Sequence, residues 1–388
     1  MDPPKSTRVD VTPSVLRWAL ARAGIDEDVA AHKHRWLTGQ RKPTFKQLEA
    51  FANVTHVPTA MLLLKEPPRE TLPIPDMRTH CRTGVHEPSG DLLDTIYLCQ
   101  RRQDWYREFA INEGATPLEF IGSASLDGDP SGVASHLSRL LGTDSDHPRS
   151  GPTDFRRALV QRIEALGVMV MISGIVGNQN RRSLSVDEFR GFVLTDPVAP
   201  LIFVNNNDAK TAQNFTLVHE LAHLFLGHSA LSDADAGGSV NHRRGEESWC
   251  NAVAAQTLLP TPVLRSMWRE QKHYQLSNVD TVARRFAVSK EMVLHRLHDC
   301  GLLDPETHRD LHEQIIAAYD DSTPPAGEPK ARGGDYYRTA ILRMGDRFTS
   351  ALIAATLEGR TTYGEAFRLI GTRNPDVIRN FAERLEIA

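Results

Sequence analysis

The sequence has few cysteines and no closely spaced pair of them. Only four of its 388 residues are cysteine, and none belongs to a Cys-x-x-Cys motif: Cys81, Cys99, Cys250 and Cys300. This spacing excludes a cysteine-rich zinc ribbon, and the length of the chain argues against a disulfide framework. A fold held together by cysteines is therefore not expected.

Long apolar runs and a secretory leader are also missing. No stretch approaches the roughly 20 apolar residues that a membrane-spanning helix needs. The N-terminal residues Met-Asp-Pro-Pro-Lys-Ser are not followed by the apolar segment of a signal peptide. The net charge of -4 argues against a protein that coats nucleic acid or anionic membrane by bulk electrostatics. The sequence therefore predicts a cytoplasmic protein that does not associate with membranes.

The composition is that of an ordinary globular protein, with 40% hydrophobic and 24% charged residues. A chain of this length can bury two or three separate cores. Helical periodicity dominates, and short strand signals occur only in the middle, so we expect a mostly helical α+β fold. The predicted segments are a helix-turn-helix-like region at 1–66, a proline-rich connector and helical region at 67–151, an α+β domain at 152–319, a linker at 320–334 and a helical region at 335–388.

Strand and helix signals alternate within the α+β segment. The apolar runs suited to buried strands are residues 168–172, 192–194 and 201–204. Helices are expected at about residues 211–226 and 246–259, the second ended by prolines at 260 and 262. The segment therefore predicts a small sheet packed against helices.

The first of these helices carries a metal-binding motif. His219 and His223 lie four residues apart, so both imidazoles project from one face of the helix and can ligate one tetrahedral zinc ion. Glu220 stands beside the first histidine, where a carboxylate can deprotonate a water molecule. The flanking residues are almost all apolar, and burying three polar side chains there without partners costs several kcal/mol, roughly 2–7 for each neutral polar group. A bound metal removes that cost.

Zinc needs a third protein ligand, and spacing alone leaves its identity open. The metzincin pattern requires glycine seven residues and histidine ten residues after the first histidine, but Leu226 and Ser229 stand there. His228 is out of register and is more typical of a surface histidine beyond the helix end. Glu246 and Glu247 both lie near the start of the next helix. Either carboxylate is a candidate.

A family resemblance distinguishes between the two glutamates. The run Phe215-Thr216-Leu217-Val218-His219-Glu220-Leu221-Ala222-His223, followed by Glu247-x-x-Cys250-Asn251 and ending in Leu258-Leu259-Pro260, resembles the ImmA/IrrE family of zinc metallopeptidases. The resemblance implies a zincin-like domain, with His219, His223 and Glu247 as zinc ligands and Glu220 as the catalytic base. It places Asn251 next to the ligands without binding metal, and it makes Glu246 a solvated neighbour.

The resemblance also implies an activity and a partner. We expect zinc-dependent hydrolysis of a peptide bond in a specific regulatory protein, typically a transcriptional repressor, often in a stress response. A donor for the tetrahedral oxyanion is expected nearby, and the candidates are Tyr274, His273 and His242. The alternatives are a DNA-binding regulator that uses the zinc fold as a sensor, and a catalytically silent adaptor that zinc stabilises. Retention of Glu220 argues against the adaptor, because zinc binding does not need a base.

The N-terminal segment resembles part of a Cro/C1-type helix-turn-helix domain. The pattern Trp36-x-x-Gly39-x-x-x-Pro43-Thr44 matches the end of such a domain. Residues 25–35 are too few for the two helices and the turn that should precede Trp36, since these need about 16–20 residues. Residues 1–66 hold ten Lys or Arg and seven Asp or Glu, a net charge of +3 that is mild for a DNA-binding module. The sequence favours a shortened domain used for protein contact, with DNA binding as the alternative.

Overall fold

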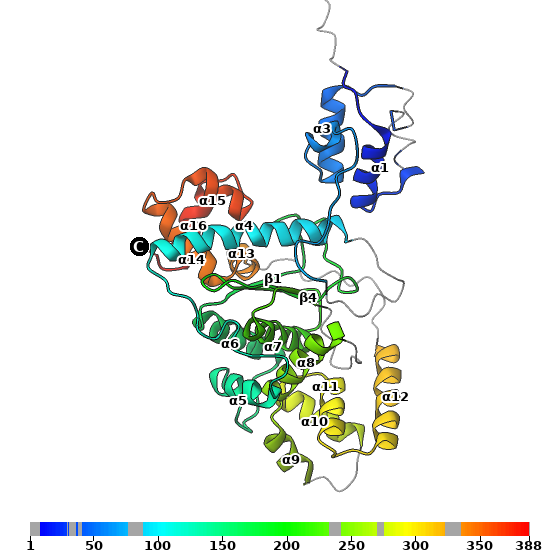
Figure 1. The fold of residues 1–388 in the computed structure, drawn as a ribbon, viewed down its shortest axis with the longest axis vertical. Helices are drawn as coiled ribbons and strands as arrows, with labels where there is room; N and C mark the ends of the chain where they lie inside the picture. The colour runs from blue at the N-terminus through cyan, green and yellow to red at the C-terminus, as the bar shows by residue number, and fades with distance from the viewer. Residues whose placement is uncertain are drawn as a thin grey trace, which may run out of the picture. The chain divides into compact units, whose positions relative to one another are not determined.

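The computed structural model describes residues 8–28, 30, 36–37, 41–76, 88–232, 242–269, 275–322 and 335–387, without the side chains of 242–244, 269 and 318–322. The chain divides into two compact units (Figure 1). The first comprises Met1–Pro73 with Val85–Ile96, and the second comprises Ile74–Gly84 with Tyr97–Ala388.

The first unit is a small helical domain. Its regular elements are α1 (Pro13–Arg22), α3 (Phe45–Thr55), the 3-10 helix η1 (Met61–Leu63) and the start of α4 (Gly90–Asn112). The apolar faces of α1 and α3 form its core around Trp36 and Phe51, whose rings meet edge to face with centroids 5.0 Å apart. Thr44 and Gln47 form a capping box at the start of α3. Thr12 precedes α1, but its hydroxyl does not cap the helix and instead donates to the carbonyl of Leu64.

The helices expected between α1 and Trp36 fall largely outside the described residues. Residues 29 and 31–35 are not described, nor are residues 38–40 after Trp36. The shortened helix-turn-helix domain, and with it DNA binding, therefore stays a prediction.

The second unit is built on a mixed four-stranded sheet with the order β1-β3-β2-β4. Strand β1 pairs parallel with β3, whereas β2 pairs antiparallel with both β3 and β4. The strands are β1 (Met169–Ser173), β2 (Gly191–Leu194), β3 (Leu201–Asn205) and β4 (Ala230–Ser232). The first three match the predicted strands closely. The very short β4 is not anticipated by any apolar run in the sequence.

Both faces of this sheet are covered, which explains why its strands are apolar at successive positions. One face packs on α6 (Pro152–Ala165) and α7 (Lys210–Leu226) through residues such as Val170 and Ile202. Met171 points to the opposite face, where its sulfur lies 4.0 Å from Cys99 Sγ of α4. Figure 1 shows the sheet between α4 on one side and α6 and α7 on the other.

Further helices extend the core away from the sheet. They are α5 (Pro130–Leu140), α8 (His242–Leu258), α9 (Thr261–Arg269), α10 (Leu276–Phe286), α11 (Lys290–Asp299) and α12 (Pro305–Ser322). The side chains of α10 and α11 belong to the same hydrophobic cluster as those of α7 and α8. Helices α10 and α11 are therefore an integral part of this core, and the hydroxyl of Ser289 caps α11 by accepting from the N–H of Met292.

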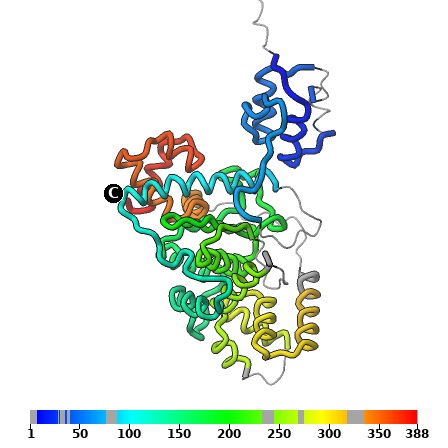
Figure 2. Tube along the Cα trace, in the orientation of Figure 1, coloured from blue at the N-terminus to red at the C-terminus, as the bar shows by residue number. Residues whose placement is uncertain are grey.

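The C-terminal helices also pack on the second unit. They are α13 (Tyr336–Met344), α14 (Asp346–Leu357), α15 (Tyr363–Ile370) and α16 (Asp376–Arg384). The buried guanidinium of Arg102 on α4 donates to the carbonyl of Leu369, and Trp105 packs edge to face on Phe348. In the trace of Figure 2 these helices, coloured orange to red, lie beside the cyan α4.

The edge of the sheet at β4 is closed by the chain itself. The backbone N–H of Leu231 donates to the carbonyl of Pro75 over 3.0 Å, and Asp76 forms a parallel bridge with Leu231. The proline-rich connector thus covers hydrogen-bonding groups that would otherwise be open to another chain. Among the described helices, none combines the length and apolar character needed to cross a bilayer.

Candidate metal centre

Two crossing helices bring the predicted metal ligands together. His219 and His223 lie one turn apart on α7, which is buried on all sides from Gln213 to its last residue. Glu247 lies on α8 and is only 5% exposed. Gly227 ends α7 in a left-handed conformation at φ 77°, as the last turn of a helix often requires. The three side chains therefore meet inside the core.

The distances between the ligand atoms fit one tetrahedral metal ion. His219 Nε2 lies 3.1 Å from His223 Nε2. Glu247 Oε2 lies 3.2 Å from His219 Nε2, and Glu247 Oε1 lies 3.3 Å from His223 Nε2. Ligands held at 2.0–2.1 Å in a tetrahedron around zinc are separated by roughly 3.3 Å. The ligand atoms of these three buried side chains all lie within 4.8 Å of one another, so they could hold one metal ion.

The charges around the cluster also suit a cation. Burial opposes ionisation of Glu247, but His219 and His223 outweigh it and lower the pKa of this carboxyl to about 2. Both glutamate oxygens are therefore available as ligands at neutral pH. Two imidazoles and one carboxylate are a donor set typical of catalytic zinc, and they leave a coordination position for water.

Glu220 is a buried carboxyl group that makes no well-formed hydrogen bond among the described residues. It is 0% exposed, and the hydroxyl of Ser232 on β4 lies close enough to lower its pKa slightly. Burial raises its pKa to about 8, His223 opposes this rise, and Glu247 adds to it. An isolated buried carboxylate is costly, so the arrangement fits a group that operates on a water molecule beside a cation.

Glu246 is not the solvated neighbour that the sequence suggests. It is 7% exposed, and its Oε1 lies 3.2 Å from Nδ1 of His223 and 3.1 Å from Nδ1 of His228. The side chain therefore orients His223, leaving Nε2 of that ring for the metal. The prediction was wrong because the first turn of α8 packs against α7, where His223 and His228 surround the Glu246 carboxylate.

The remaining predicted residues lie further from the ligands. His228 is half-exposed and contacts Glu246, and it is not part of the metal cluster. Asn251 follows Glu247 by one turn of α8, and its buried Oδ1 has no hydrogen-bond partner among the described residues. Of the oxyanion candidates, His273 and Tyr274 and the side chain of His242 fall outside the described residues.

Gly191 on β2 is a site residue to which no role follows from the sequence pattern. A Cβ atom at this position would lie 2.5 Å from Cγ2 of Thr216 and 2.9 Å from Oε1 of Glu220. Only glycine lets the sheet approach α7 this closely, and the approach positions the Glu220 carboxylate. The sequence holds no signal for this contact, because it depends on how α7 crosses the sheet.

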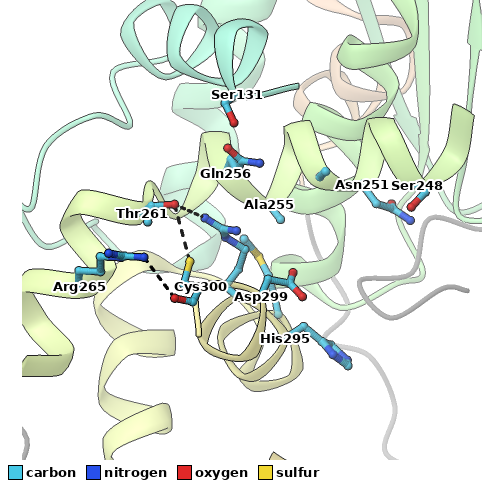
Figure 3. A pocket seen from close by; sticks show the side chains of 13 residues that line it. Ser131, Ser248, Asn251, Ala255, Gln256, Thr261, Arg265, His295, Asp299 and Cys300 are labelled. Carbon is cyan, nitrogen blue, oxygen red and sulfur yellow. Dashed lines mark hydrogen bonds between the residues drawn. The ribbon is translucent and has the colours of Figure 1, made fainter. Parts of the chain in front are cut away.

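A groove of about 580 Å³ runs along α8, with Asn251 and Ser248 lining it (Figure 3). Arg296 of α11 lies in its wall, 5% exposed, and donates to the hydroxyl of Thr261 over 2.8 Å. His295 of the same helix also lines the groove. The groove therefore reaches from the helix that carries Glu247 to α11.

Comparison with known families agrees with this geometry. Residues 163–298 match the peptidase family Peptidase_M78, described as the IrrE N-terminal-like domain. The matched segment contains the sheet and the helices that carry His219, His223 and Glu247, so it supports the ImmA/IrrE resemblance and a peptidase. Residues 344–384 match a domain of unknown function, DUF8813. No curated protein matches the chain.

Proposed function

We propose that the chain is a zinc-dependent metallo-endopeptidase that hydrolyses a peptide bond in a specific regulatory, repressor-like protein. The observation that carries the proposal is the triangle of His219, His223 and Glu247, whose sides of 3.1–3.3 Å suit one zinc ion. The match of residues 163–298 to a peptidase family supports the same reaction class. The choice of a repressor-like substrate rests on the ImmA/IrrE resemblance.

His219, His223 and Glu247 would hold the metal. When bound, zinc supplies a Lewis acid that polarises a carbonyl group and lowers the pKa of a water molecule toward about 7. Glu246 holds the His223 ring by its Nδ1 and so leaves Nε2 facing the cluster.

Glu220 would move the proton. Its carboxyl group follows His219 directly on α7, makes no well-formed hydrogen bond among the described residues, and lies close to the backbone of Gly191. Burial raises its pKa to about 8, and a cation held beside it would favour the ionised form. The carboxylate can then accept a proton from the attacking water and deliver it to the leaving amine, which is general base and then general acid catalysis. Its burial excludes bulk water, which strengthens these electrostatic effects.

The test compares wild-type protein with the Glu220→Gln variant. Both are incubated with a bacterial cell extract, and new protein N-termini are identified by mass spectrometry. We expect specific new termini with wild type, at least a 100-fold loss of them with Glu220→Gln, and unchanged zinc content in the variant. The exposed Glu119 offers a matched control, since Glu119→Gln should cleave like wild type. Equal cleavage by Glu220→Gln and wild type would contradict the proposal.

A further inference from the structure

Helices α11 and α12 bring four imidazoles together away from the candidate metal centre. His295 and His298 lie three residues apart on α11, and His308 and His312 lie four apart on α12. Residues at these spacings project from one face of a helix. Four of the 16 histidines in the chain thus gather within 18 residues of sequence, on two helices that pack against each other.

The ring separations resemble those of metal-bound imidazoles. The ring centroids are 4.8 Å apart for His298 and His308, and 5.3 Å apart for His295 and His308. His312 lies 6.1 Å from His295 and 6.2 Å from His308. Imidazoles on one tetrahedral zinc have centroids roughly 5 Å apart, from a bond of 2.0–2.1 Å plus the ring radius. The chain offers its own comparison, since the His219 and His223 rings are 4.9 Å apart.

His308 lies at the centre of this group, within 6.2 Å of each of the other three rings. Its Nε2 is buried and has no hydrogen-bond partner among the described residues. Burial lowers the pKa of His308, and the other three histidines lower it further, while Asp299 opposes them. This lowering favours the neutral form of His308, which is the form that binds metal.

We propose that His295, His298, His308 and His312 form a second metal site, specific for a divalent transition metal of the Zn²⁺, Ni²⁺ or Cu²⁺ class. An all-imidazole donor set suits these ions, whereas Ca²⁺ and Mg²⁺ require oxygen ligands. The ring nitrogens of these histidines do not all lie within the 4.8 Å that includes the ligand atoms of His219, His223 and Glu247, so binding requires rotation of the side chains. His298 is 44% exposed, and the other three rings are partly exposed, which leaves them room to rotate.

This site would fasten α12 to the peptidase-like domain. His295 and His298 lie in the last residues of the matched segment 163–298, whereas His308 and His312 lie beyond it. The metal would join the two helices at the position where His295 lines the groove along α8 (Figure 3). It would be structural, because no carboxylate comparable to Glu220 is buried beside these rings within the described residues.

The test counts bound metal. Wild type, His295→Gln/His308→Gln and the matched control His136→Gln/His147→Gln, which replaces two exposed histidines, are dialysed against buffered Zn²⁺ and analysed for zinc per chain. We expect the cluster variant to bind one zinc ion fewer than wild type and the control to bind the same number as wild type. Circular dichroism shows whether each variant folds.

A second readout is independent of the candidate active site. In a Glu247→Gln background, added Ni²⁺ should raise the melting temperature, and adding His295→Gln/His308→Gln should abolish that rise. Equal zinc content in wild type and the folded cluster variant would overturn the second site, as would a Ni²⁺ effect that survives the loss of both histidines. Neither result would affect the His219 site.

Discussion

The backbone of Gly191 lies against the carboxylate of Glu220, so close that a methyl group would come within 2.9 Å of Oε1. The same methyl group would come within 2.9 Å of the carbonyl oxygen of Phe203, which belongs to the sheet and cannot move aside easily. The strand thus determines where the proposed catalytic base stands. The sheet, although it supplies none of the metal ligands, is part of the site.

Replacing Gly191 by alanine should therefore impair catalysis without removing zinc. The added methyl group displaces Glu220, and a shift of about 1 Å in a catalytic group costs roughly 100-fold in rate. Peptide cleavage and zinc content are measured on the same preparation. Gly132→Ala is the control, because the space around that glycine is open and full activity is expected. Full activity in Gly191→Ala would contradict this role.

Glu246 should control zinc affinity through His223. Glu246→Ala removes the acceptor 3.2 Å from Nδ1 of His223, and the loss of such a partner lowers metal affinity by roughly 10–100-fold. Competition with a fluorescent zinc chelator measures this change. His228→Gln is the comparison, since His228 is 54% exposed and contacts the same Oε1 atom of Glu246 from outside the metal cluster. If the two variants lose affinity equally, Glu246 does not act through His223.

Glu164 should make stability depend on pH. Burial raises the pKa of Glu164 to about 7. The negative charge of Asp346 adds to this rise, whereas a hydrogen bond from the N–H group of Arg347 opposes it. The folded state then binds a proton between about pH 4.5 and 7 that the unfolded state has released, so the free energy of unfolding falls as the pH rises through this window.

The Glu164→Gln variant should flatten that dependence. The free energy of unfolding is measured by urea titration at pH 5 and at pH 8. Its decrease between these two pH values should be about 2–3 kcal/mol larger in wild type than in the variant. Glu119→Gln, at an exposed position, should behave like wild type. Parallel pH profiles for wild type and Glu164→Gln would show that this carboxyl titrates normally.

Arg22 should stabilise the first unit. Its side chain is 8% exposed and lies 2.9 Å from Glu70 Oε2 and 2.6 Å from Asp94 Oδ1. Arg22→Met leaves both carboxylates without this partner, and the loss of one member of a buried ion pair costs about 3 kcal/mol. Hydrogen exchange of the α1 amides in the full chain measures the effect.

The same helix carries a matched control for Arg22. The contact of Arg17 with Glu27 is 3.5 Å long and exposed at both ends, at 57% and 56%. Arg17→Met should therefore change the free energy of opening, measured by hydrogen exchange of the α1 amides, by less than about 1 kcal/mol. A similar effect of the two substitutions would mean that burial of the Arg22 pair is not what stabilises the unit.

Local patterns were sufficient to predict the parts of the fold and site that lie close in sequence. The spacing of His219 and His223 needs only one turn of helix, and the apolar runs at β1 and β3 need only burial on both faces. The third zinc ligand, by contrast, depends on how α7 and α8 cross. Residue spacing left both Glu246 and Glu247 as candidates, and only the family resemblance indicated Glu247.

The contacts that the sequence does not reveal are tertiary. Glu246 and Glu247 are adjacent and chemically alike, and both turn out to face His223, one at Nδ1 and the other at Nε2. No local rule separates these roles, because they depend on the depth of α8. The approach of Gly191 to Glu220 depends in the same way on two segments that are distant along the chain. The contact of His295 with His308 depends on how the turn between α11 and α12 orients the two helices.

The most direct test of the central claim is zinc analysis of purified Glu247→Ala protein beside wild type, with Glu119→Ala as the control. If His219, His223 and Glu247 hold a zinc ion, Glu247→Ala should contain one zinc ion fewer per chain than wild type, and the control should match wild type. Equal zinc content in all three proteins, with Glu247→Ala folded, would contradict the account.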